Sequence, residues 1–186
     1  MRGLRMARVV LDRLYLFAGY AAGGFLLAIF VLMMLLSAGR PLGLNIPAGD
    51  DFVSWCMVAT SFLGLAHTFR HGEMIRVGLL IDRLEGRTRH YVEIAALLIG
   101  GFFVAFFTYY AALLTFDSWR FHDMAQGVLP VPLWIPQLGY SGGLLILLIA
   151  FIDELINVLR GNPPRYEKPK PQTAEEVVEQ AIQSGV

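Results

Sequence analysis

Residues 14–36 read LYLFAGYAAGGFLLAIFVLMMLL, a run of 23 residues without a charged side chain. A helix needs about 20 apolar residues to cross a hydrocarbon core of about 30 Å. Because the bilayer interior offers no water, a spanning segment must satisfy its own backbone hydrogen bonds, and an uninterrupted run of this length does so as an α-helix. This stretch therefore predicts a transmembrane helix.

Three more apolar runs follow along the chain. They are residues 52–69, which contain His67, residues 91–116, which carry Glu93 near their start, and residues 133–152, which have no charge. Each run is long enough, or nearly so, to cross the hydrocarbon core as a helix. The sequence therefore predicts an all-α membrane protein with four transmembrane helices.

The composition agrees with a membrane location. Hydrophobic residues make up 56% of the 186 residues and charged residues 16%, against about 45–50% and about 25% in soluble domains. The net charge is zero, so no electrostatic field favours nucleic acid as a partner. A single cysteine, Cys56, excludes an internal disulfide and a metal cluster built from cysteines.

The first run has one alternative reading, a cleaved signal peptide, because Arg2, Arg5, Arg8 and Arg13 precede it. Its 23 residues exceed the roughly 7–15 apolar residues of a signal peptide's hydrophobic region, and Leu36-Ser37-Ala38 is a poor cleavage site. We therefore expect a retained helix.

Lysine and arginine alternate between the two sides of the predicted membrane domain. Four precede the first run, one lies in residues 37–51, five in 70–90, one in 117–132 and four in the C-terminal tail. Because positive residues favour cytoplasmic loops, this alternation predicts that both termini are cytoplasmic. Tryptophan prefers the membrane–water interface, and all the tryptophans fall at the predicted outer ends: Trp55, Trp119 and Trp134.

The inner connection between the second and third helices has an apolar stripe over residues 73–85. The stripe consists of Met74, Val77, Leu80, Ile81 and Leu84. This spacing predicts an amphipathic helix that lies in the plane of the interface, with an ordinary loop as the alternative. We expect residues 1–160 to form a single four-helix membrane domain and residues 161–186 a flexible cytoplasmic tail.

Few side chains in the predicted spans offer chemistry. A haem between helices would need a second histidine at the depth of His67, and the other histidines lie in the connecting segments. Glu93 can extend toward the cytoplasmic surface, where we also expect Asp153 and Glu154 to be solvated. Asp50-Asp51 precedes the second helix, where carboxylates interact favourably with the helix dipole. We expect no catalytic residue, metal site, substrate site or cofactor in this chain.

The predicted helices do carry residues suited to close packing. Gly19 and Gly23 in the first helix, and Gly139 and Gly143 in the fourth, follow the GxxxG spacing that allows two helix backbones to approach closely. Seven aromatic residues crowd the third helix: Phe102, Phe103, Phe106, Phe107, Tyr109, Tyr110 and Phe116. We expect these residues to face neighbouring helices or lipid.

Three stretches together resemble a known family. They are Asp50-Asp51-Phe52 with Trp55, Phe62-Leu63-Gly64 and Arg70-His71-Gly72-Glu73; Ile75-Arg76-Val77 with Leu79-Leu80 and Asp82-Arg83-Leu84; and Val131-Pro132-Leu133-Trp134-Ile135-Pro136 with Gly142 and Gly143. With the alternating topology, they resemble the small membrane subunit of tripartite ATP-independent periplasmic (TRAP) transporters, the DctQ-like family. Met74 departs from the histidine that the family often has before its Ile-Arg-Val element.

The resemblance implies a non-catalytic scaffold subunit in a bacterial inner membrane. Its partners would be a large DctM-like membrane subunit of the elevator type, a periplasmic DctP-like binding protein and membrane lipids, and the complex would take up an organic acid with sodium. The candidate subunit or lipid contacts are Gly19, Gly23, Trp55, Arg70, Glu73, Arg76, Arg83, Trp134, Gly139 and Gly143. The alternative is a membrane anchor of a respiratory or other redox complex, since four helices with few charges suit that class too.

Overall fold

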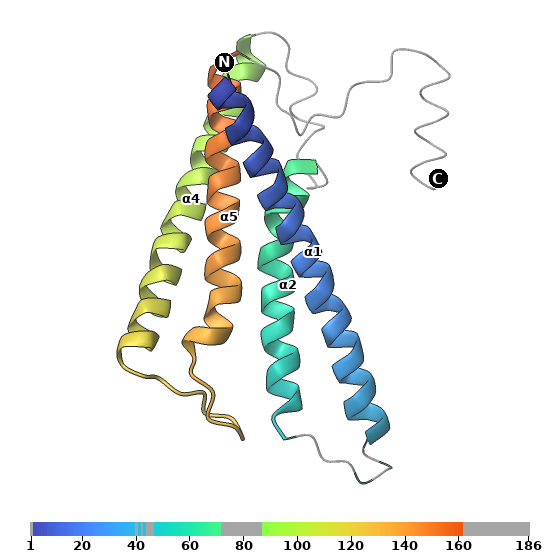
Figure 1. Cartoon of the computed structure of the whole chain (residues 1–186). Coiled ribbons are helices and arrows are strands. Elements are labelled where there is room, and N and C mark those ends of the chain that lie inside the picture. The colour runs from blue at the N-terminus through green and yellow to red at the C-terminus, as the bar shows by residue number, and fades with distance from the viewer. Residues whose placement is uncertain (1, 40, 42, 44–46, 72–86, 162–186) are drawn as a thin grey trace, which may run out of the picture.

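The computed structural model describes residues 2–39, 41, 43, 47–71 and 87–161. Within these residues the chain folds into four helices: α1 (Arg2–Gly39), α2 (Gly49–His71), α4 (Arg87–Arg120) and α5 (Trp134–Leu159) (Figure 1). The predicted amphipathic segment, residues 73–85, and nearly all of the predicted tail lie outside the described residues.

The prediction of an all-α protein with four helices able to span a membrane is confirmed. Each helix contains a segment that is long and apolar enough to cross, and the part of the chain that the structure describes holds no strand, only an isolated bridge between Met124 and Pro132. Every helix is longer than the apolar run that predicted it. The fourth continues from the expected end at Ile152 to Leu159, because a helix continues past the hydrocarbon core wherever its backbone bonds and side-chain contacts persist.

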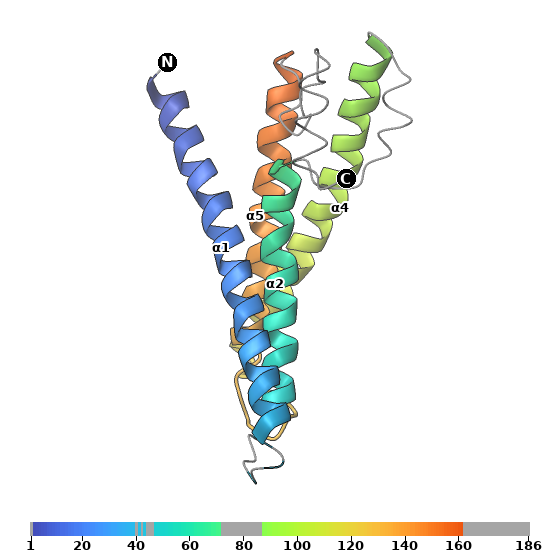
Figure 2. The ribbon, with the colours of Figure 1, turned by 90° about the vertical axis from the view of Figure 1, so that its right-hand side faces the viewer.

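The helices form an open row rather than a closed bundle. In the order of the row, α1 packs on α2, α2 on α5 and α5 on α4, whereas α1 touches α5 only slightly and has no extensive contact with α4 in the described residues. Figures 1 and 2 show α1 and α4 as the outermost helices of this row. In the most apolar window of α5, 39% of the residues are buried, against 6% in α1. The row therefore has an enclosed centre and two exposed flanks.

Helices that follow one another along the chain run in opposite directions, so all helix termini gather at two opposite ends of the helix axes. The end where α1 begins and α5 finishes contains Asp12, Arg70 and Asp153, and we call it the charged end. The opposite end contains Trp55, Trp119 and Trp134, and we call it the tryptophan end. Residues 121–133 connect α4 to α5 at the tryptophan end through a short hairpin, in which the Ala125 N–H donates to Val131 O (2.8 Å) and the Leu133 N–H to Asp123 O (2.9 Å).

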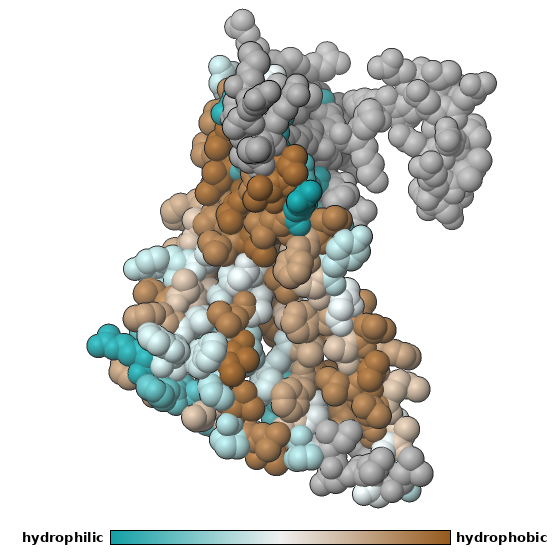
Figure 3. All heavy atoms as spheres, viewed as in Figure 1, coloured by the Kyte–Doolittle hydropathy of each residue, from teal (hydrophilic) through white to brown (hydrophobic). Residues whose placement is uncertain are grey.

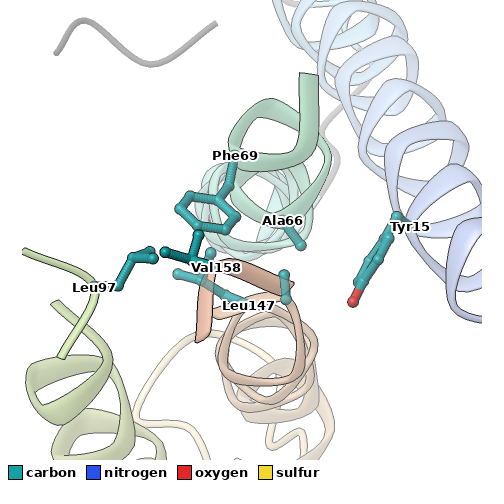
Figure 4. Close-up of a cluster of buried hydrophobic side chains, with 7 residues drawn as sticks. Tyr15, Ala66, Phe69, Leu97, Leu147 and Val158 are labelled. Atoms are coloured by element: carbon teal, nitrogen blue, oxygen red, sulfur yellow. The ribbon is translucent and has the colours of Figure 1, made fainter. Parts of the chain in front are cut away.

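The buried core lies between the helices toward the charged end (Figure 4). Its members come from all four helices: Tyr15, Ala66, Phe69, Leu97, Leu147, Ala150 and Val158. Beside them, Phe151 of α5 stacks on Phe69 of α2 with ring centroids 4.3 Å apart. Phe151 also meets α4 at Gly100, where an added Cβ would lie 2.9 Å from the ring. One aromatic side chain thus joins three helices, and it fits because α4 has a glycine at that position.

Large apolar side chains cover the outward faces of the row. On α1 and α4 they include Phe17, Phe30, Leu98, Phe103 and Phe107, each about half exposed or more. Figure 3 shows apolar residues over much of the visible face, with hydrophilic residues where α4 ends at the lower left. A monomeric soluble protein rarely exposes apolar patches of this extent, so these faces are suited to lipid or to another membrane protein.

Candidate functional site

The charged end is held together by one arginine. Arg70, near the end of α2, donates from Nη2 to Asp12 Oδ1 of α1 (2.6 Å) and from Nη1 to Asp153 Oδ2 of α5 (3.1 Å). Its guanidinium also lies over the ring of the buried Tyr15, 5.6 Å from the ring centroid, which is favourable for a cation. Arg70 therefore links α1, α2 and α5, which are neighbours in the row.

The carboxylates of the charged end differ from the expectation of solvated groups. Asp153 has only 18% of its side chain exposed and is paired with Arg70, and Glu154 is 2% exposed within the chain. The Asn157 side-chain amide donates to Glu154 Oε1 (3.4 Å), and Arg89 Nε donates to the buried Glu93 at Oε1 (3.2 Å). The expectation was wrong for Glu154 and Asp153, because α5 continues past them and neighbouring helices cover them.

The contact between α2 and α5 is close enough to require glycine. A Cβ added to Gly143 would lie 2.5 Å from the carbonyl carbon of Phe62, and one added to Gly139 would lie 2.9 Å from Ala59 Cβ. The structure therefore places both glycines of this GxxxG motif at a contact within the chain, where the two backbones meet. Their predicted contact with another subunit stays a prediction.

The GxxxG motif of α1 divides into one packed and one open position. A Cβ on Gly19 would lie 2.8 Å from Nδ1 of His67 in α2, whereas one on Gly23 would meet no atom within 4 Å. Nearby, the Thr60 hydroxyl donates to the Ala22 carbonyl oxygen across the same contact (3.4 Å). Gly19 thus makes room for the His67 imidazole between α1 and α2, and Gly23 faces outward.

At the tryptophan end, the hairpin contacts the start of α2. Asp50 and Asp51 occupy the first turn of α2, where the helix dipole favours them. The Asp51 carboxylate lies so close to Gly127 at the hairpin tip that any Cβ there would overlap it. Trp55, one turn further along α2, packs edge-to-face on Phe52 with centroids 5.1 Å apart.

The described residues of α4 and α5 line the following two grooves. The larger, about 430 Å³, is at the tryptophan end and is lined by Thr108, Ala112, Thr115, Phe116, Trp119, Trp134, Leu138, Ser141, Gly142 and Leu145. The other, about 350 Å³, lies toward the charged end and is lined by Leu97, Leu98, Gly101, Phe102, Ala105, Leu148, Phe151, Ile152 and Leu155. Apolar side chains dominate both linings, so neither groove resembles a polar substrate site.

Of the predicted interface residues, those on the inner connection cannot be placed. Glu73, Arg76 and Arg83 lie outside the described residues. Among the residues that the structure describes, no group of three or more histidine, cysteine or acidic side chains is arranged to hold a metal ion. What the described residues bring together is packing and ion pairs between helices.

The structure places Asp12 and Tyr15 beside Arg70. Neither residue was among the contact residues predicted from the sequence. A signal was present, because Asp12, Arg70 and Asp153 each lie within a few residues of the same predicted membrane boundary. Opposite charges at one depth on different helices are candidates for pairing, although the sequence does not show which helices are neighbours.

Comparison with protein families gives a match over most of the chain. The model of a family described as tripartite ATP-independent periplasmic transporters, DctQ component, matches residues 27–161. These residues run from the second half of α1 to just past the end of α5. They include the contacts among α2, α4 and α5 described above, whereas Asp12, Tyr15, Gly19 and Ala22 of α1 lie before the matched range. A search of curated proteins gives no match.

Proposed function

Because the family model matches most of the chain, this protein belongs to the DctQ component family of TRAP transporters, and we propose that it is a non-catalytic scaffold subunit that supports a large permease subunit in the membrane. The family is one of transporter components, and such a component acts as part of an assembly. The particular role of a scaffold is inferred from how the described helices are arranged.

The observation that carries the proposal is the open row of helices. A row leaves both end helices, α1 and α4, with apolar faces that no other helix of the described chain covers. A self-contained channel or carrier needs a polar path enclosed by its helices. An open row encloses no such path, and its long apolar faces suit a subunit that adds membrane area to a larger partner.

The contacts inside the row support a rigid role. Helix backbones meet closely at Gly143, ring stacking joins Phe69 to Phe151, and Arg70 links three helices at the charged end. Packed helices with small residues at their contacts have little freedom to slide. A part that stays fixed while a neighbouring transport domain moves needs this kind of internal support.

The remaining features of the proposal follow the family. The partners are a large DctM-like membrane subunit and a periplasmic DctP-like binding protein, and the complex uses sodium to take up an organic acid. The chain lies in a bacterial inner membrane with the charged end cytoplasmic, which the alternation of lysine and arginine supports.

Reconstitution in liposomes tests the proposal. Uptake of a panel of radiolabelled organic acids is measured under a sodium gradient in three preparations. The first contains this chain alone, the second contains the large subunit and the binding protein without this chain, and the third contains all three proteins. We expect uptake only when the large subunit and binding protein are present, and we expect it to be greatest with all three. Uptake by this chain alone, or equal uptake with and without it, would contradict a scaffold role.

A further inference from the structure

The groove at the tryptophan end of α4 and α5 has a length that matches one half of a bilayer. Its lining runs from Thr108 to Trp119 on α4 and from Trp134 to Leu145 on α5. Each stretch covers eleven helical steps, or about 16 Å at a rise of about 1.5 Å per residue. The hydrocarbon core is about 30 Å thick, so one leaflet occupies about 15 Å.

The groove ends about 16 Å from the two tryptophans, close to half the thickness of a hydrocarbon core, because α4 and α5 cross there. The helices diverge toward the tryptophan end in Figure 1 and toward the charged end in Figure 2. At the inner limit of the groove, the buried Thr108 hydroxyl lies 2.7 Å from Val104 O of its own helix and 3.3 Å from Leu144 O of α5. The groove toward the charged end is a separate space beyond this point.

The lining offers no hydroxyl donor to a ligand. The Thr115 hydroxyl donates to Ala111 O (2.8 Å) and the Ser141 hydroxyl to Gln137 O (2.9 Å), both within their own helices. Thr108 is engaged in the same way. A side chain that bonds the carbonyl four residues earlier presents mainly its carbon atoms outward, so the groove suits a hydrocarbon ligand.

The mouth of the groove lies between two tryptophans, Trp119 on α4 and Trp134 on α5. Indole rings favour the depth at which lipid headgroups meet acyl chains, because one part of the ring is apolar and its N–H donates a hydrogen bond. The groove toward the charged end has no tryptophan in its lining. The geometry points to a phospholipid bound with one acyl chain in the groove between Thr108 and Trp119 and its glycerol region at the two tryptophans.

The shape favours an acyl chain over a helix of another protein. A transmembrane helix continues across both leaflets, whereas this groove closes at the crossing of α4 and α5. An acyl chain is narrow and ends at the middle of the bilayer. The depth of the groove therefore favours an acyl chain.

Photo-crosslinking of the full chain in nanodiscs tests this assignment. The probe is a phosphatidylcholine with a diazirine in the middle of one acyl chain, added at a few per cent to phosphatidylethanolamine and phosphatidylglycerol. Crosslinked peptides are quantified by mass spectrometry. We expect crosslinks in residues 108–119 and 134–145 to exceed several-fold those on the exposed face of α1 around Phe30, which serves as the reference for contact with bulk lipid.

Two variants fill the groove from its two walls, Gly142→Leu on α5 and Ala112→Leu on α4. A Cβ at Gly142 would meet no atom within 4 Å, so the leucine enters the groove without displacing a helix. Gly24→Leu is the matched control, because Gly24 also faces open space but lies on α1. Both groove variants should lose the groove crosslinks several-fold, while Gly24→Leu should keep them, with helix content by circular dichroism unchanged in all three.

Three results would overturn the assignment. Equal crosslinking of the groove and the α1 face would show ordinary contact with bulk lipid. Groove crosslinks that persist in both filled variants would place the lipid elsewhere. Groove crosslinks that disappear when a large membrane subunit is bound would show that a protein segment occupies the groove in the complex.

Discussion

Replacing Gly143 with alanine should destabilise the protein, whereas the same change at the neighbouring Gly142 should not. A Cβ on Gly143 would lie 2.5 Å from the Phe62 carbonyl carbon, 2.7 Å from its oxygen and 2.8 Å from Leu63 N. All three atoms belong to the backbone of α2, so no side chain can turn away to make room. The helices α2 and α5 must therefore separate.

The size of the effect follows from that separation. Carbon atoms pack at about 3.5 Å or more, so Gly143→Ala must move α2 and α5 apart by about 1 Å along a contact that runs through the centre of the row. Overpacking of this kind costs about 1–3 kcal/mol. Alanine is the better helix former by about 0.5–1 kcal/mol, a gain that both variants share. The difference in unfolding free energy between the two variants therefore isolates the packing cost, about 1–3 kcal/mol.

The comparison is made in mixed micelles. Each variant is unfolded by increasing the fraction of sodium dodecyl sulfate, and helix content is followed by far-ultraviolet circular dichroism. Gly142→Ala should match or exceed the stability of the unchanged protein, since its Cβ meets nothing within 4 Å. If Gly143→Ala proved as stable as Gly142→Ala, the close contact between α2 and α5 would be refuted.

Three further outcomes are expected. A double-mutant cycle on Arg70 and Asp153, which are about one-fifth exposed, should give a coupling free energy of about 1 kcal/mol in micelle unfolding. The same cycle on Arg70 and the more exposed Asp12 should give a smaller coupling free energy. Zero coupling in both cycles would contradict the linkage of the helices by Arg70. Phe151 stacks on Phe69 of α2 and meets Gly100 of α4, and its truncation to alanine should cost about 2–3 kcal/mol because it leaves a cavity at a half-buried site. Truncation of the exposed Phe103 should cost little, and equal costs would contradict the described core. The purified chain should show no Soret band in its visible spectrum, because it belongs to a family of transporter components, and a band that titrates with added haem would revive the redox-anchor alternative.

The helices could be predicted from the sequence because an uncharged run of sufficient length is a local property. Their ends could not. A rule that stops a helix at the first charge ends α5 at Ile152, yet the helix continues to Leu159. It does so because Asp153 reaches Arg70 and Glu154 lies against its neighbours. Those contacts bring together residues far apart along the chain, and local hydropathy does not contain them.

The glycine motifs show the same limit within the spans. Gly19 and Gly23 share one spacing, as do Gly139 and Gly143, yet Gly23 alone faces open space. Spacing places two residues on one face of a helix, but the position and crossing of the next helix decide how far along that face the contact extends. The order of the row, α1–α2–α5–α4, is a tertiary property of this kind.

We propose that this chain works as a fixed part of a larger transporter, and co-purification with the large subunit is the decisive experiment. In this experiment an affinity tag is added to the chain, which is expressed in bacteria together with a large DctM-like subunit. The tagged chain is then purified in mild detergent and analysed by native mass spectrometry. A scaffold subunit should appear in a stable complex whose mass equals the sum of the two proteins in fixed proportion. Recovery of the tagged chain free of the large subunit, under conditions in which both are folded and present in the membrane, would contradict the claim.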